Sequence, residues 1–296
     1  METVLTVTNL LLLLFWVRLW SLPDKELYFN PFLSAPTRLT DRVLDFLRPA
    51  LPLPGRLTSL FLLAFLLILR GAALNHFRPA EPWSLTVGTL FSFSAREPGI
   101  HGALTFSALH FLFFVARFWG VYVLTQLLTP VLQRDRASEA FHFAALPLSA
   151  LRRWLQILLL LTVHAILVYE LTRIGSLTAH IPPAIDGRPF VAPDAHSTNG
   201  LLFLACLTLL SAADLLMMAW QFMFALLVGS FLAVMLQNAL LNAICGEGIA
   251  TLFGRSRKRL IVGFLDLTPL LYMASAYICY HILVLSVLPA IIMKIG

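Results

Sequence analysis

The sequence predicts an all-α membrane protein, a polytopic bundle of about six transmembrane helices. Of its 296 residues, 59% are hydrophobic and 12% are charged, whereas about 25% of the residues in a soluble domain are charged. The mean hydropathy is +0.85. A water-soluble monomer is excluded, because so much apolar surface would have no interior large enough to hold it.

Six apolar stretches account for this hydropathy, each able to cross a hydrocarbon core about 30 Å thick. The first, at residues 4–20, has no basic segment before it and no small-residue cleavage site after it, so we expect a retained span and not a signal peptide. The others lie at 57–74, 104–128, 154–171, from 201 onward, and at 270–291.

The fifth stretch is nearly continuous from 201 to 242. As one helix it would be about 60 Å long, and two spans would also fit by length. We expect one long tilted helix, or a span preceded by an interfacial segment that bends near 211–214 or 229–230.

Basic residues predict the orientation, because they concentrate in the loops at 21–56, 131–153 and 243–259. Six crossings put these three loops on one side, which the positive-inside rule assigns to the cytoplasm. Both termini would then be periplasmic in a bacterial inner membrane. The densest basic patch is Arg255, Arg257, Lys258 and Arg259. The net charge of +6 therefore indicates orientation and not nucleic-acid binding.

An amphipathic helix is expected between the first two spans, capped by Ser34 and with Pro36 in its first turn. Its apolar positions at helical spacing are Leu39, Val43, Phe46 and Leu47. Its charged positions are Arg38, Asp41, Arg42, Asp45 and Arg48. Opposite charges are expected to be neighbours in the pairs Arg38/Asp41, Arg42/Asp45 and Asp45/Arg48, whose members are three residues apart. Such a helix lies in the bilayer interface. It either ties two spans together or offers a surface to a protein or a lipid headgroup.

Helix-start signals recur before two spans. Thr58 or Ser59 can cap the second span, and Asp266 and Thr268, followed by Pro269, can begin the sixth. Between the second and third spans, residues 83–93 alternate between apolar and polar, which predicts a short hairpin or strand at the membrane surface. The three cysteines show no metal spacing and no disulfide framework.

These motifs resemble the YggT family of integral membrane proteins, also called YlmG. The matching residues are Asn30-Pro31, Thr40-Asp41, Leu47-Arg48-Pro49, Pro52, Pro54-Gly55 and Leu57-Thr58-Ser59. Arg56 stands where the family has an acidic residue, and Ser59 where it has proline. A second copy keeps Asp266-Leu267-Thr268-Pro269 but lacks the Asn-Pro motif.

The resemblance implies a division into a first YggT-like hairpin at 1–75, a central hairpin with two extracytoplasmic loops at 76–200, and a second YggT-like hairpin at 201–296. The central part is either a third, eroded hairpin or an insertion. The family is associated with membrane organisation, cell division, plastid and nucleoid distribution, and osmotic tolerance. One plastid branch is associated with assembly of a cytochrome b haem. No catalytic residues are implied.

Ionisable residues inside spans are candidates for function, because each is costly at mid-bilayer. Arg117 is the deepest basic residue and could pair with Asp214, either to staple helices or to line an ion path. Glu170 and Arg173 are expected to pair or snorkel at the end of the fourth span. His110, His164 and His281 are weak candidates for haem ligands; packing histidines would look the same.

We therefore expect a non-enzymatic scaffold or accessory subunit. Its partners would be membrane lipids, some of them bound, and other membrane proteins or further copies of the chain; neither nucleic acid nor a metal is expected. The alternatives are an ion channel or transporter that uses Arg117 and Asp214, and a haem or cofactor assembly factor that uses the histidines. No nucleotide-binding, nucleophile-elbow or zinc-protease motif occurs in the sequence.

Overall fold

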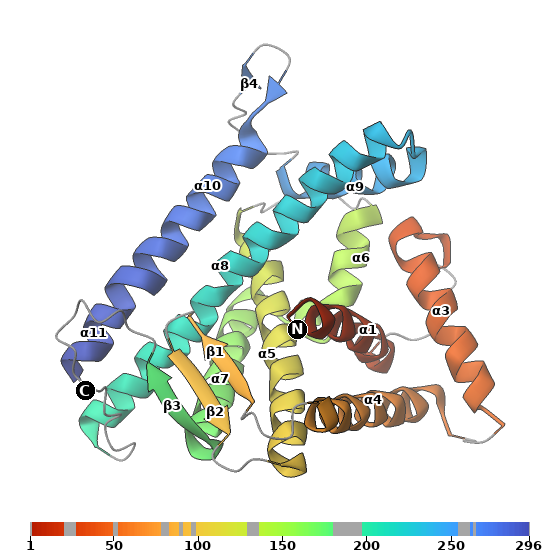
Figure 1. Cartoon of the computed structure of the whole chain (residues 1–296). Helices are drawn as coiled ribbons and strands as arrows, with labels where there is room; N and C mark the ends of the chain where they lie inside the picture. Colours follow the sequence, from red (N-terminus) through yellow and green to blue (C-terminus); the bar gives the residue numbers. More distant parts are fainter. Residues whose placement is uncertain are drawn as a thin grey trace. The chain divides into compact units, whose positions relative to one another are not determined.

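The computed structural model is mostly helical (Figure 1). It describes residues 2–20, 28–49, 53–77, 83–88, 91–95, 99–128, 136–179, 197–253, 261–262 and 265–295. Five helical segments in this part of the chain are long and apolar enough to cross a membrane. Four are α4 (Gly55–Phe77), α5 (Ile100–Leu128), α7 (Arg153–Ile174) and α8 (Thr198–Met235).

The fifth is Thr268–Ile292, which includes α10 (Thr268–Tyr280), a π-helical stretch η2 (His281–Val287) and the start of α11 (Leu288–Ile295). The first helix, α1 (Glu2–Trp20), is apolar over the shorter stretch Val7–Trp20. A sixth crossing at this position stays a prediction.

The chain forms two compact units, and each long helical segment contributes one part to each unit. Unit 1 comprises Met1–Leu66, Val121–Gln156 and Ala219–Ser275. Unit 2 comprises Leu67–Gly120, Ile157–Met218 and Ala276–Gly296. Each unit takes segments from all three hairpins that the sequence suggests, and the division into hairpins remains a prediction.

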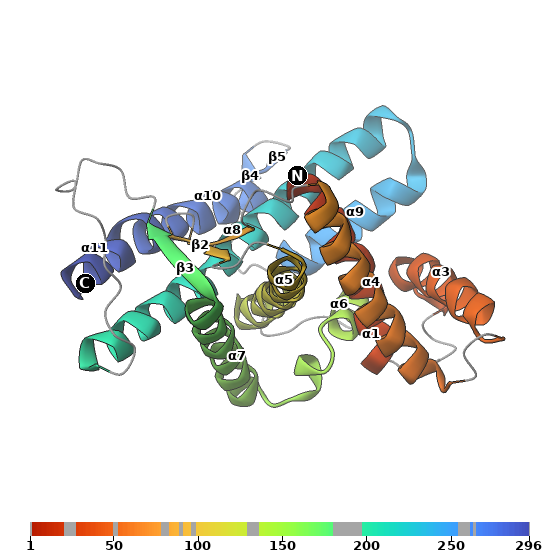
Figure 2. The same ribbon diagram turned by 60° about the horizontal axis from the view of Figure 1, so that its bottom comes forward.

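Unit 2 contains a three-stranded antiparallel sheet in the order β1-β2-β3 (Figure 1), of which Figure 2 labels β2 and β3. The strands are β1 (Ser84–Val87), β2 (Phe91–Ala95) and β3 (Gly175–Ala179). The predicted hairpin within 83–93 is confirmed, with Val87 opposite Phe91 next to the turn. The third strand, directly after α7, was not predicted.

The sheet belongs to the core of unit 2. Alternation along the strands puts Leu85, Val87, Phe91 and Phe93 on the buried side. These side chains share one apolar cluster with residues of α5, α7, α8 and the C-terminal helical segment, including Phe113, Leu171, Leu210 and Ile292. The hairpin is thus part of the buried core of unit 2 and does not lie on its surface.

Unit 1 contains α1, α3 (Pro31–Leu47), α6 (Arg136–Ala144), a 3₁₀ turn η1 (Leu148–Ala150) and α9 (Ala239–Phe253). Helix α3 is the amphipathic helix that the sequence predicts, but it starts earlier than expected. Asn30 and not Ser34 is the N-cap, because the Asn30 side chain accepts a hydrogen bond of 3.0 Å from the Phe32 N–H. Pro31 then occupies the first helical position, where its missing N–H costs nothing.

Helix α8 is one unbroken helix of 38 residues, so neither of the bends considered at 211–214 and 229–230 occurs in it, while its tilt and the number of crossings stay predictions. It ends at Met235, and α9 (Ala239–Phe253) begins before the basic connection expected at 243–259 and occupies its first part. Gln237 has a φ of 50° in the turn, and Asn238 caps α9 through the Leu241 N–H at 3.0 Å. A Cβ on Gly229 would lie 2.8 Å from the Cys245 sulfur, so α9 packs closely on α8.

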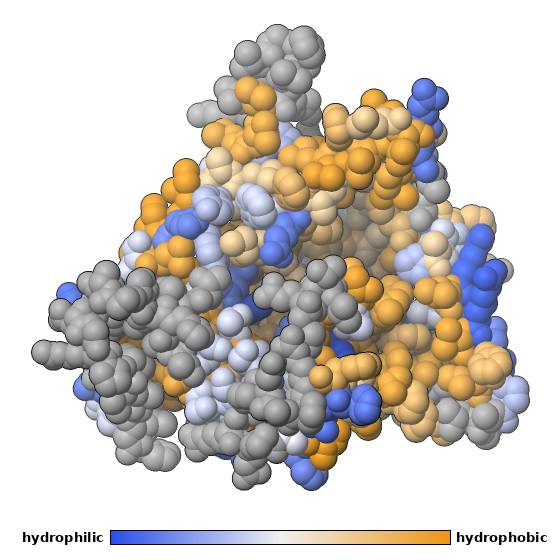
Figure 3. Space-filling view, in the orientation of Figure 1, coloured by the Kyte–Doolittle hydropathy of each residue, from blue (hydrophilic) through white to orange (hydrophobic). Residues whose placement is uncertain are grey.

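Many large apolar side chains are exposed on the described helices, among them Phe65, Ile166 and Ile278. Figure 3 shows apolar residues over much of the face that it draws. Helix α5 differs from the other four segments. Within its apolar stretch 61% is buried, against 28–33% in the apolar stretches of the others. The surfaces therefore suit a lipid environment, with α5 as the most enclosed helix.

Candidate functional site

Arg117 and Asp214 form an ion pair in unit 2, as the sequence suggested. The Arg117 Nη2 atom of α5 lies 2.6 Å from the Asp214 Oδ2 atom of α8. The side chain of Asp214 is 9% exposed and that of Arg117 is 26% exposed. The Arg117 guanidinium also lies 5.8 Å from the centre of the Phe113 ring, a distance at which a cation is attracted to an aromatic face.

The same two side chains hold the backbone of the β1–β2 turn. The Gly88 N–H donates a 3.1 Å hydrogen bond to Asp214 Oδ2. Arg117 Nη2 donates a longer hydrogen bond, 3.4 Å, to the Thr86 carbonyl. One charge therefore neutralises the other while both satisfy backbone groups at the tip of the hairpin.

This arrangement answers a physical requirement of a hairpin packed among apolar helices. In an apolar setting, each backbone N–H or C=O group that is left unsatisfied costs several kcal/mol. Non-helical backbone within a membrane protein is tolerated only where protein or water satisfies it. The Arg117–Asp214 pair does this for the tip, so we interpret it as a clamp on the hairpin.

Gly88 is required at the tip for two reasons. Its φ of +63° lies in the left-handed region, and a Cβ built there would be 2.4 Å from the Leu210 Cγ atom. A side chain would therefore be strained and would also push the turn away from α8. The glycine lets the hairpin backbone come close enough for Asp214 to accept its N–H.

One helical turn before Asp214, Ser211 carries a second polar contact between helices. The Ser211 hydroxyl is 2.9 Å from Nδ1 of His164, which lies on α7. Both residues are fully buried, and the His164 ring lies 6.4 Å from that of Phe113. Among the described residues, His164 Nε2 has no hydrogen-bond partner.

Arg70 is a third polar contact, one that sequence reasoning missed. Its Nε donates a 2.9 Å hydrogen bond to the Ser107 hydroxyl, and its Nη2 donates to the Ser107 carbonyl. The Ser107 hydroxyl in turn donates to the Leu67 carbonyl at 3.0 Å. A Cβ on Gly71 would lie 2.9 Å from Leu104 Cα, so α4 and α5 approach closely here.

Arg70, which is 7% exposed, is thus more enclosed than Arg117, which the sequence had singled out. Its signal was available: it is a lone arginine inside the apolar stretch 57–74. The absence of an obvious carboxylate partner nearby in the sequence hid it, because its partner is a serine on the next helix.

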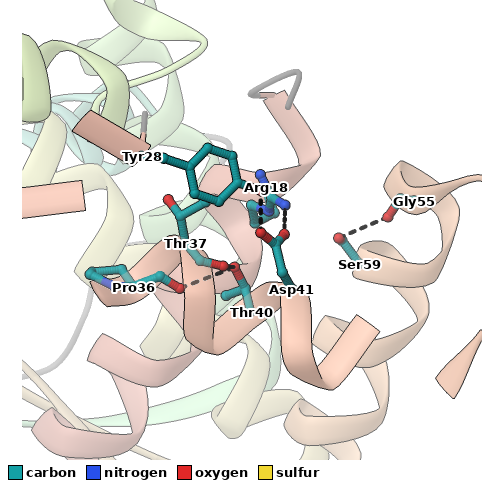
Figure 4. A network of polar contacts seen from close by, with 8 residues as sticks. All are labelled: Arg18, Tyr28, Pro36, Thr37, Thr40, Asp41, Gly55 and Ser59. Carbon is teal, nitrogen blue, oxygen red and sulfur yellow. Dashed lines mark hydrogen bonds and ion pairs between the residues drawn. The ribbon is translucent and has the colours of Figure 1, made fainter. Parts of the chain in front are cut away.

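A separate polar network organises α1 and α3 in unit 1 (Figure 4). Asp41 of α3 pairs with Arg18 at the end of α1 and accepts a hydrogen bond from the Tyr28 hydroxyl. The bond to Asp41 is the main reason why the pKa of Tyr28 is raised, with burial adding to it. The expected pairing of Asp41 with arginines of its own helix is therefore corrected.

The family-like motif residues act as helix ends and ties between helices. Asn30 caps α3 and also donates from Nδ2 to the Arg136 carbonyl of α6, at 2.7 Å. Arg48 is the C-cap residue of α3, and Gly55 begins α4. Pro52 lies outside the described residues.

Thr58 and Ser59 do not cap the second span as expected. Thr58 lies within α4 and donates its hydroxyl to the Leu53 carbonyl at 3.2 Å, while Ser59 donates to the Gly55 carbonyl at 2.9 Å. They therefore bond back to carbonyls and accept no N–H as a cap would.

At the motif before the last helical segment, the Leu267 carbonyl accepts the first helical hydrogen bond of α10, from the Leu271 N–H at 3.0 Å. Thr268 is thus the first helical residue, with Pro269 in the first turn as expected. Asp266 lies in β5 (Leu265–Asp266), which pairs with β4 (Ile261–Val262).

The other candidates have separate surroundings. The Glu170–Arg173 pair is confirmed at 2.7 Å, and both side chains are exposed. His281 lies against Tyr277, with ring centres 4.2 Å apart, and His110 is partly buried on α5. The basic patch Arg255, Arg257, Lys258 and Arg259 lies outside the described residues.

The buried position of His164 does not suit a haem ligand. His164 has no exposed surface, so a porphyrin could reach its Nε2 only if the helices moved apart. Within the described parts of the chain, no group of three or more histidine, cysteine, aspartate or glutamate side chains could hold a metal ion.

Comparisons with known proteins identify no relative: no family model, curated protein or solved structure matches the chain.

Proposed function

We propose that the protein is a non-enzymatic integral membrane scaffold or accessory subunit, resembling YggT proteins, that organises partner membrane proteins or lipids. In this proposal it resides in the bacterial cytoplasmic membrane with its basic loops in the cytoplasm. The observation that carries the proposal is the engagement of Arg117 and Asp214 by the β1–β2 turn. Groups that could have served ion transfer are bound to protein backbone instead.

The other polar side chains of unit 2 support the same proposal. Arg70 bonds to Ser107, and His164 bonds to Ser211. Each contact joins two helices, and polar contacts of this kind stabilise helix packing in membranes by about 1 kcal/mol. A rigid bundle with apolar outer surfaces suits a protein that acts through lateral contact.

Co-purification tests this proposal. The full chain is extracted in a mild detergent, and co-purifying proteins are identified against an unrelated multi-span protein expressed at the same level. The proposal predicts one or a few membrane proteins in stoichiometric amounts, or a defined homo-oligomer. A lone monomer would contradict the organisation of partner proteins and leave lipids as the partners in the proposal.

Ion flux tests the channel alternative, because transport would require the same pair. Purified protein is reconstituted in liposomes, and flux of K⁺, Na⁺, H⁺ and Cl⁻ is measured for the wild type and Asp214→Asn. The scaffold proposal predicts no flux above that of empty liposomes. Selective flux that Asp214→Asn abolishes would replace it with a channel or transporter.

A further inference from the structure

Helix α3 presents three distinct faces. At 100° per residue, Thr37, Thr40 and Leu44 share the face turned toward the protein, and both threonines are buried. The remaining surface divides into a charged arc and an apolar arc. Such a helix touches protein, water and lipid at once, which is the arrangement of a helix lying in the bilayer interface.

Asp41 lies at the border of the protein-facing side and is engaged there. Its carboxylate binds Arg18 and the Tyr28 hydroxyl, as Figure 4 shows. In an isolated helix, Asp41 would instead offset Arg38, three residues away. Because α1 takes up this carboxylate, the charged arc loses one of its two negative groups.

The charged arc is therefore basic. Arg38, Arg42 and Asp45 are all exposed there. Within the part of the chain that the structure describes, no carboxylate pairs with either arginine. Two guanidinium groups one helical turn apart thus face outward, and a guanidinium fork matches the oxygens of a phosphate.

The apolar arc borders the arginines. Leu39 is 50% exposed and Phe46 is 82% exposed. At 100° per residue, both side chains lie next to Arg38 and Arg42 on the circumference of the helix. Figure 3 shows hydrophilic residues gathered at its right edge, where Figure 1 places α3, with apolar residues beside them. A soluble anion would gain nothing from these side chains, whereas the acyl region of a lipid would cover them.

We propose that α3 binds the headgroups of anionic phospholipids through Arg38 and Arg42, while Leu39 and Phe46 enter the acyl region of the same leaflet. The proposal specifies the lipid partner within the proposed function. It needs no protein partner, so co-purification and lipid preference can fail independently of each other.

Local lipid composition tests this proposal. Ala35 is exposed on α3, between the two arcs, and the change Ala35→Cys is made in a chain whose Cys206, Cys245 and Cys279 are changed to alanine. A fluorophore attached to the thiol introduced at position 35 reports quenching by brominated lipids in nanodiscs. Brominated phosphatidylglycerol and brominated phosphatidylcholine are compared at the same mole fraction, at 50 mM and 500 mM salt.

The proposal predicts stronger quenching by phosphatidylglycerol than by phosphatidylcholine. Each arginine near an anionic surface should enrich that lipid about fivefold at low salt, and the preference should shrink at 500 mM. The double change Arg38→Gln/Arg42→Gln should make the two lipids equal. The control Arg56→Gln/Arg152→Gln removes as much charge from exposed positions of unit 1 and should keep the preference.

Three outcomes would overturn the proposal: equal quenching by both lipids in the wild type, a preference that survives Arg38→Gln/Arg42→Gln, or an equal loss in the control. If the double variant does not fold, the single variants Arg38→Gln and Arg42→Gln replace it. Each should halve the logarithm of the preference for phosphatidylglycerol over phosphatidylcholine. An unchanged preference in both single variants counts against the proposal. Inorganic phosphate added in detergent should leave the fluorescence unchanged; a response would indicate a phosphate-ion site and no lipid site.

Discussion

Breaking the Arg117–Asp214 pair should destabilise the protein strongly and non-additively. Arg117→Gln leaves a carboxylate that is 9% exposed and that, within the described part of the chain, keeps the Gly88 N–H as its one partner. Removing one member of a buried ion pair costs about 3–5 kcal/mol. Asp214→Asn should cost less, about 2 kcal/mol, because the amide oxygen can still accept from Gly88 and Arg117 is 26% exposed.

The double variant Arg117→Gln/Asp214→Asn measures the interaction between the two charges apart from the contacts that each makes with other groups. With both charges removed, neither is left uncompensated, so the double change should cost about 2 kcal/mol less than the sum of the single changes. The free energy of unfolding is measured by reversible unfolding in mixed micelles, followed by tryptophan fluorescence.

The Glu170–Arg173 pair is a matched control. Its atoms are 2.7 Å apart, nearly the same separation, but the side chains are 37% and 64% exposed. Exposed pairs contribute at most about 1 kcal/mol, so Glu170→Gln/Arg173→Gln should show little coupling. Additivity of Arg117→Gln and Asp214→Asn within about 0.5 kcal/mol would refute the clamp interpretation.

Three further predictions use the same unfolding assay or a titration. Gly88→Ala should cost about 2–4 kcal/mol, because its backbone would be strained and its Cβ would meet Leu210 at 2.4 Å; a neutral effect would show that the turn lies elsewhere. Asn30→Ala should cost about 2 kcal/mol through a lost cap and a lost buried hydrogen bond, whereas Asn30→Asp should keep the cap and recover part of this. The pKa of Tyr28 is raised by its hydrogen bond to Asp41. The contribution of this hydrogen bond to the free energy of unfolding should therefore be complete below pH 10 and decrease as the pH rises through the folded-state pKa of Tyr28. Tyr28→Phe should remove this loss and one late-ionising component of the phenolate absorbance. Identical titrations of the variant and the wild type would contradict the prediction.

Hydropathy and period predicted the elements that depend on local pattern. The spans within α4, α5 and α7 and the β1–β2 hairpin follow from runs and alternation that a single segment carries. The Arg117–Asp214 and Glu170–Arg173 pairs were also predictable, because opposite charges in or beside apolar spans have few other partners.

The sequence could not show contacts that depend on which segments meet. Asp41 had Arg38 three residues away, yet it pairs with Arg18 across 23 positions. Arg70 looked like an interruption of a span until Ser107 was placed beside it. The start of α9 was missed, because Gln237 and Asn238 interrupt the apolar run for only two residues, although Asn238 is a residue type that caps helices.

The backbone partners of the clamp were equally hidden. A side-chain pattern can suggest that Arg117 meets Asp214, but it carries no sign of the Gly88 N–H or the Thr86 carbonyl. These groups turn a candidate ion path into a support for a hairpin, which is why the sequence alone left both interpretations open.

Hydrogen exchange of residues 84–88 and 91–95 in lipid nanodiscs tests the clamp most directly. If Arg117 and Asp214 hold the hairpin tip inside unit 2, these amides should exchange slowly in the wild type and distinctly faster in Arg117→Gln, with little change in Glu170→Gln/Arg173→Gln. Exchange of these residues in the wild type at the rate of an unstructured peptide would contradict the account.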